Sequence, residues 1–90
     1  MPHYETLQFS SDFMDDLVSD NFTKAEQRRF VRALQLLDTD ERHPSLRVHQ
    51  LQGVRMGTWS ASATDELRIT FVRMANGRKR LTGCSRHYQR

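Results

Sequence analysis

Residues 67–84, Leu-Arg-Ile-Thr-Phe-Val-Arg-Met-Ala-Asn-Gly-Arg-Lys-Arg-Leu-Thr-Gly-Cys, decide the fold that this chain is expected to adopt. Apolar and polar side chains alternate over 67–73, which predicts a half-buried strand. The Asn-Gly pair at 76–77 is typical of a tight hairpin turn, so 79–84 is expected to return as the neighbouring strand. Because successive side chains of a strand point to opposite faces, Arg68 is expected on the face away from the core.

The N-terminal part of the chain predicts one strand and two helices. Residues 3–9 alternate imperfectly and predict a strand, whereas a serine cap and apolar spacing predict a short amphipathic helix over 11–19. Thr23 and Glu26 have the spacing of a capping box, which predicts the start of a second helix over 23–39. The short connection between the two helices indicates an αα-hairpin.

Beyond the helices the period of the pattern changes from helical to alternating. Residues 42–45 contain a proline and indicate a loop, and short strands are expected over 46–51 and 59–64. The sequence therefore predicts a single α+β domain over residues 1–90. Its order is an N-terminal strand, an αα-hairpin and an antiparallel sheet of three to four strands, with the helices on one face.

Composition excludes several classes of protein. Hydrophobic residues make up 37% of the 90 residues, and no apolar run approaches the ~20 residues of a membrane span. The N-terminus lacks the pattern of a signal peptide, and a lone cysteine is compatible with a reducing cytosol, so we expect a cytoplasmic protein. Cys84 and His87 have half of a zinc spacing, but no other paired ligands exist, so no metal or other cofactor is expected and Cys84 is expected to pack.

Charge divides the chain into two unlike halves. Residues 1–41 carry a net charge of −5, whereas residues 42–90 carry +8, and nine of the ten basic side chains in the second half are arginine. Arginine is suited to bidentate phosphate contact, so this half indicates either a polyanion partner or a solvated basic face. The chain then ends in Cys-Ser-Arg-His-Tyr-Gln-Arg at 84–90. A terminus so rich in Arg, His and Tyr indicates a nucleic-acid contact or a proton-transfer site.

These segments, taken in order, resemble the RelE/ParE toxin superfamily, and within it the YoeB and RelE branch. The resemblance lies in the stretch His-Pro-Ser-Leu-Arg-Val-His at 43–49, Leu51, Gly-Thr-Trp-Ser at 57–60, Thr-Asp-Glu-Leu-Arg-Ile at 64–69, and the terminal Cys-x-x-His-Tyr. It implies a small toxin of a toxin–antitoxin module that cuts messenger RNA in the ribosomal decoding site without a metal. It also implies a cognate antitoxin, hetero-oligomer formation with it, and 2′,3′-cyclic phosphate or 3′-phosphate products.

Metal-free RNA cleavage requires a base, fixed positive charge at the phosphate and an acid for the leaving oxygen. The resemblance assigns His87 as the acid and Arg68 to phosphate stabilisation. Tyr88 either stacks on a base, orients the scissile phosphate or packs on the sheet edge. His49 occupies the position where a YoeB-like pattern places a glutamate. A neutral histidine can accept a proton, so His49 is either the base or a structural or RNA-binding residue.

Further basic residues are candidates for contact with the RNA backbone: Arg47, Arg55, Arg78, Lys79, Arg80 and Arg86. Arg78–Arg80 follow a hairpin tip and can equally be a solvated turn. Trp59 shares its parity with two alanines, which favours sheet or core packing over a role as a stacking platform.

Two other functional classes share the expected fold. A ParE-like protein would inhibit gyrase and leave transcripts uncut, but the His87-Tyr88 tail with Arg68 argues against it. A catalytically inactive relative would bind only an antitoxin or RNA, and the replacement of a glutamate by His49 keeps this alternative open.

Overall fold

The computed structural model describes residues 4–53 and 57–86. The chain order is β1 (Leu7–Phe9), α1 (Ser11–Leu17), α2 (Lys24–Thr39), a 3₁₀ turn η1 (Pro44–Leu46), β2 (His49–Gln50), β3 (Thr58–Ser62), β4 (Leu67–Arg73) and β5 (Lys79–Arg86). The expected α+β class is confirmed, and β4 has the bounds that the alternating pattern predicts.

The strands form one five-stranded sheet in the order β1-β5-β4-β3-β2. The four strands β2 to β5 pair antiparallel, as expected, whereas β1 joins the edge of β5 in parallel and makes the sheet mixed. A parallel neighbour requires a crossover connection. Here the connection from β1 to β5 contains both helices, the η1 turn and the strands β2 to β4.

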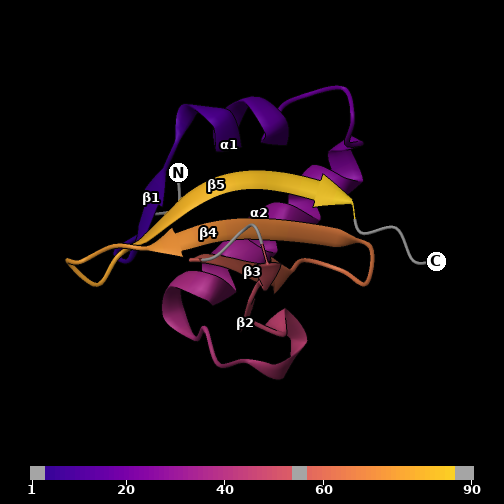
Figure 1. Cartoon of the computed structure of the whole chain (residues 1–90). Coiled ribbons are helices and arrows are strands. Elements are labelled where there is room, and N and C mark those ends of the chain that lie inside the picture. The colour runs from indigo at the N-terminus through magenta and orange to yellow at the C-terminus, as the bar shows by residue number, and fades with distance from the viewer. Residues whose placement is uncertain (1–3, 54–56, 87–90) are drawn as a thin grey trace.

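The two helices occupy different places around the sheet (Figure 1). Helix α2 lies behind β4 and β5 and starts at the expected capping box, in which Thr23 and Glu26 exchange hydrogen bonds of 3.1 and 2.9 Å. The shorter α1 runs along β5 beyond the end of β1. There the Asp16 carboxylate accepts from the backbone N–H of Cys84 at 3.1 Å, so a helix side chain satisfies a strand group at this edge.

The core lies between α2 and one face of the sheet. Its members share near-complete burial and come from β1, both helices, the segment between the helices, η1 and the three central strands. The largest are Phe13, Phe30, Phe71, Leu34, Leu37, Leu46, Ile69 and Leu81. Cys84 is 8% exposed and packs with them, as expected. Burial raises the pKa of its thiol to about 12, so the sulfur stays protonated at neutral pH.

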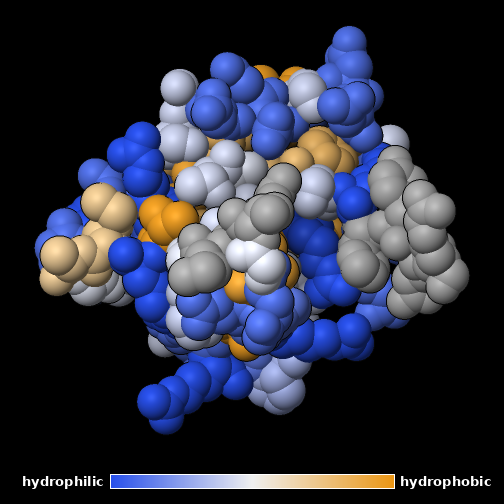
Figure 2. All heavy atoms as spheres, viewed as in Figure 1, coloured by the Kyte–Doolittle hydropathy of each residue, from blue (hydrophilic) through white to orange (hydrophobic). Residues whose placement is uncertain are grey.

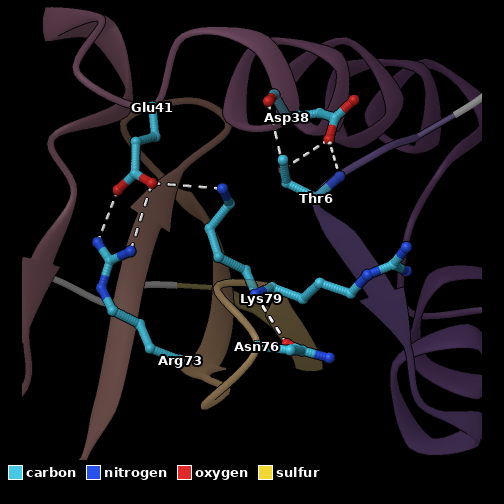
Figure 3. A network of polar contacts seen from close by, with 7 residues as sticks. Thr6, Asp38, Glu41, Arg73, Asn76 and Lys79 are labelled. Atoms are coloured by element: carbon cyan, nitrogen blue, oxygen red, sulfur yellow. Dashed lines mark hydrogen bonds and ion pairs between the residues drawn. The ribbon is translucent and has the colours of Figure 1, made fainter.

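A network of hydrogen bonds and ion pairs stabilises the junction of α2 with the strands (Figure 3). Glu41, just after α2, accepts two hydrogen bonds from Arg73 at 2.6 and 3.3 Å and a third from Lys79 at 3.3 Å. Lys79 itself is 4% exposed. Nearby, Asp38 at the end of α2 accepts from the hydroxyl and the backbone N–H of Thr6, at 2.6 and 2.7 Å.

Candidate active site

Polar side chains line the face of the sheet that α2 does not cover. Register places His49 opposite Ser60 and Ser60 opposite Thr70, while the next row pairs Ser62 with Arg68 and Arg68 with Ser85. Because alternate residues share a face, these two rows form one polar surface across four strands. Hydrophilic residues dominate much of the molecular surface seen in Figure 2.

This polar surface is hollowed into a pocket of about 210 Å³, which we name the sheet pocket. Its lining comprises His49, Leu51, Ser60, Arg68, Thr70, Ser85 and Arg86. The structure therefore brings together two of the expected catalytic residues, His49 and Arg68, although 19 positions separate them in the sequence. Thr70 was expected on this face from its strand parity with Arg68. Ser60 and Ser85 were not assigned to the site from the sequence, but they pair with Thr70 and Arg68 across the strands.

Arg68 is half-buried and held by a neighbour on β3. Its guanidinium donates to the hydroxyl of Ser62, which is itself 4% exposed. One guanidinium N–H group is thus engaged by the protein. Arginine carries five donors, so others remain to bind an anion in the sheet pocket.

The orientation of His49 is set by the backbone two residues earlier. Its Nδ1 lies 2.8 Å from the carbonyl oxygen of Arg47. A carbonyl oxygen only accepts, so Nδ1 carries the hydrogen and, in the neutral ring, Nε2 carries the lone pair. Arg47 has the left-handed conformation, with φ 47° and ψ 45°, which ends the η1 turn. His49 is exposed, so its free nitrogen is open to a ligand.

The remaining expected RNA-binding residues are placed differently. Arg78 and Arg80 are exposed at and beside the β4–β5 hairpin, and Arg47 is exposed and pairs with Asp65 at 3.3 Å. Lys79 requires a correction, because it is buried and its ammonium binds Glu41, which leaves it unavailable to an RNA backbone.

Arg86 also departs from the expected RNA contact. Its guanidinium is bound to the carboxylate of Glu26 at 2.6 and 2.7 Å, although its residue borders the sheet pocket. Glu26 of the α2 capping box therefore binds Arg86, which the sequence analysis expects to contact the RNA backbone.

Three expected site residues, Arg55, His87 and Tyr88, lie outside the described residues. Trp59 packs as expected: its ring stacks on Phe71 at 6.4 Å between centroids. Within residues 4–53 and 57–86, no cluster of three or more His, Cys, Asp or Glu side chains could hold a metal ion. No helix in the same ranges is long and apolar enough to cross a membrane.

Comparison with known proteins identifies relatives by structure. Neither a family model nor a curated protein sequence matches the chain. A YoeB/ParE toxin from Agrobacterium tumefaciens superposes with a TM-score of 0.66 at 24% identity, covering 93% of this chain and all of that one. The YoeB–YefM complex from Staphylococcus aureus gives 0.70 at 17% identity, covering 97% and 100%. The E. coli DinJ–YafQ toxin–antitoxin complex gives 0.67 at 15% identity, covering 90% of each chain.

These likenesses define the class of fold. The chain adopts the fold of the RelE/ParE toxins, and its structural neighbours include YoeB and YafQ toxins. Identities of 24% and below make this a statement about the fold, and the activity is argued separately from the sheet pocket.

Proposed function

We propose that the chain is the toxin of a type II toxin–antitoxin module and a metal-free endoribonuclease that cuts messenger RNA in the ribosomal A site. The observation that carries this proposal is the sheet pocket, which places His49 and Arg68 together on a fold shared with YoeB and YafQ toxin structures. The partners implied are messenger RNA, the ribosome and a cognate antitoxin that neutralises the toxin in a hetero-oligomer.

The first chemical step is activation of the RNA 2′-hydroxyl. The Nε2 lone pair of neutral His49 takes the proton, and the 2′-oxygen attacks the adjacent phosphorus. The hydrogen bond from Nδ1 to the Arg47 carbonyl stabilises the imidazolium that forms, because the charged ring donates more strongly.

Charge then accumulates on the pentacoordinate phosphorus. Arg68, oriented by Ser62, is placed to neutralise its non-bridging oxygens. In the proposal, His87 donates a proton to the 5′-oxygen as the P–O5′ bond breaks, which leaves a 2′,3′-cyclic phosphate and a 5′-hydroxyl. Tyr88 stacks on a base or orients the phosphate in the same step. Both residues are assigned from the sequence.

The test is cleavage of a translated message in a ribosome-containing assay, with mapping of 5′ ends after induction in cells. We expect His49→Ala and His87→Ala each to lower the rate roughly 10²- to 10⁴-fold. Arg68→Ala should lower the rate by about 10²- to 10³-fold. The matched control is Arg32→Ala, which changes an exposed arginine on α2 outside the sheet pocket.

Three results would overturn the proposal. Full cleavage by both histidine variants would remove the catalytic assignment. Uncut transcripts together with inhibited DNA supercoiling would instead identify a gyrase inhibitor. A wild-type protein that neither arrests growth nor cuts RNA would be a binding module.

A further inference from the structure

A second pocket lies on the other side of the same sheet edge. It measures about 380 Å³, and its lining includes three arginines, Arg42, Arg47 and Arg73, together with Glu41, His43 and Trp59. We name it the tryptophan pocket. The proposed cleavage reaction uses none of these side chains.

Register shows how the two pockets are related. On β3, Ser60 pairs with His49 and lines the sheet pocket, whereas its neighbour Trp59 pairs with Gln50 and lines the tryptophan pocket. Successive strand residues point to opposite faces, so the two-residue strand β2 separates the pockets.

Arg73 provides the flat surface of the tryptophan pocket. Its guanidinium carbon lies 4.3 Å from the centroid of the Trp59 ring, and Glu41 fixes its plane with two hydrogen bonds. The Glu41 carboxylate is already balanced by Arg73 and Lys79. Held guanidinium planes and aromatic rings are the surfaces on which unpaired RNA bases stack.

Cations at the rim complete the site. Arg42 is exposed and has no ion-pair partner among the described residues. Arg47 pairs with Asp65 at 3.3 Å, and both side chains are largely exposed, so this pair exchanges readily for another anion. An aromatic-and-guanidinium floor with exposed arginines at the rim recognises a base carrying a phosphate, whereas a plain acidic peptide would leave the floor unused.

We propose that the tryptophan pocket binds a nucleotide of single-stranded RNA, with its base on the guanidinium plane of Arg73, which Trp59 supports from the other side, and its phosphate on Arg42 and Arg47. This inference deepens the proposed function and rests on it for the identity of the substrate. The site would hold a nucleotide flanking the one that is cut, so it contributes affinity and base preference rather than bond breaking.

The chain has one tryptophan, so intrinsic fluorescence reports this pocket directly. The probe is adenosine 5′-monophosphate, compared with adenosine and with inorganic phosphate. We expect saturable quenching by the nucleotide, with Kd values for the two fragments at least about tenfold higher because each lacks one of the two contacts.

Two variants and a control sharpen the test. Arg42→Ala should raise the Kd about tenfold through loss of a phosphate contact. Arg73→Lys keeps the charge and the partner Glu41 but removes the stacking plane, and should also raise the Kd about tenfold. Arg28→Ala, an exposed arginine on α2 outside this pocket, should leave it unchanged.

The outcomes separate this inference from the proposed function. RNA cleavage without nucleotide quenching, or equal weakening by Arg28→Ala and Arg42→Ala, would overturn the inference and leave the cleavage proposal standing. Quenching without cleavage would support the inference and count against the nuclease. Quenching by a polyglutamate peptide, together with no quenching by the nucleotide, would overturn it in favour of a protein-docking site.

Discussion

Arg86 at the end of β5 and Glu26 in the first turn of α2 are joined by two hydrogen bonds of 2.6 and 2.7 Å across 60 residues of sequence. The same guanidinium donates to the carbonyl oxygen of Asn21 at 2.7 Å and lies over the ring of Phe22. Glu26 also completes the capping box of α2. One carboxylate therefore fixes both the start of a helix and the last described residue before His87.

The first prediction concerns the acid stability of this contact. Hydrogen bonding from Arg86 and from the Thr23 backbone lowers the pKa of Glu26 from 4.5 to about 2. A carboxyl with a lowered folded-state pKa stabilises the fold fully above its unfolded pKa and loses that contribution as pH falls through the folded value. Glu26→Gln should therefore be less stable than wild type above about pH 4.5, and the difference should shrink between about pH 4.5 and about pH 2.

Urea unfolding at a series of pH values measures this difference. Glu66→Gln is the matched control, because Glu66 is exposed and has no ion-pair partner among the described residues. A gap between wild type and Glu26→Gln that stays constant across the acid range would contradict the prediction.

The second prediction concerns buried Lys79. Glu41→Gln leaves the ammonium of Lys79 buried without its anion and should lower the free energy of unfolding by about 2 kcal/mol. Lys79→Met replaces that ammonium with an apolar side chain of similar length and should cost about 1 kcal/mol or less. Denaturant unfolding measures the free energy of unfolding of both variants. If Lys79→Met loses more than Glu41→Gln, the ion pair itself stabilises the fold.

The third prediction concerns Gly83 on β5. A Cβ atom there would lie 3.1 Å from the Asp16 carboxylate and 3.3 Å from the Thr70 hydroxyl. Asp16 would have to move from the Cys84 N–H that it accepts, so Gly83→Ala should cost about 1–2 kcal/mol of unfolding free energy. The double variant with Asp16→Ala tests the cause, because the cost of the added methyl should fall once the carboxylate is gone. If Gly83→Ala costs as much unfolding free energy in the Asp16→Ala background, the contact with Asp16 is not the cause of the loss.

Local patterns predicted most of the fold. The capping box of α2, the alternation of β4 and the Asn-Gly turn each depend on neighbouring residues, so sequence alone placed them. The parallel pairing of β1 with β5 depends on residues more than 70 positions apart in the chain. No short-range pattern encodes such a contact, and the expected N-terminal strand accordingly lacked a partner.

The residues of the candidate site were likewise predicted only in part from the sequence. Strand parity placed Arg68 on the open face, and the structure brings it to His49. The basic pattern could not separate exposed arginines from cations used in the fold, because charge complementarity with Glu26 and Glu41 is a tertiary property. Arg86 and Lys79 were therefore assigned to RNA from composition alone.

The last prediction concerns two histidines with opposite hydrogen-bond roles. His49 Nδ1 faces the carbonyl oxygen of Arg47, whereas His43 Nδ1 faces the backbone N–H of Ser45 at 3.2 Å. The carbonyl requires a donor and the N–H requires an acceptor, so neutral His49 should carry its hydrogen on Nδ1 and neutral His43 on Nε2. Long-range ¹H–¹⁵N correlation spectra above the titration range distinguish the two tautomers. If both residues carry the hydrogen on Nε2, His49 lacks the Nε2 lone pair with which it is proposed to take the 2′-hydroxyl proton. If both carry it on Nδ1, His43 no longer accepts the hydrogen bond from the N–H of Ser45.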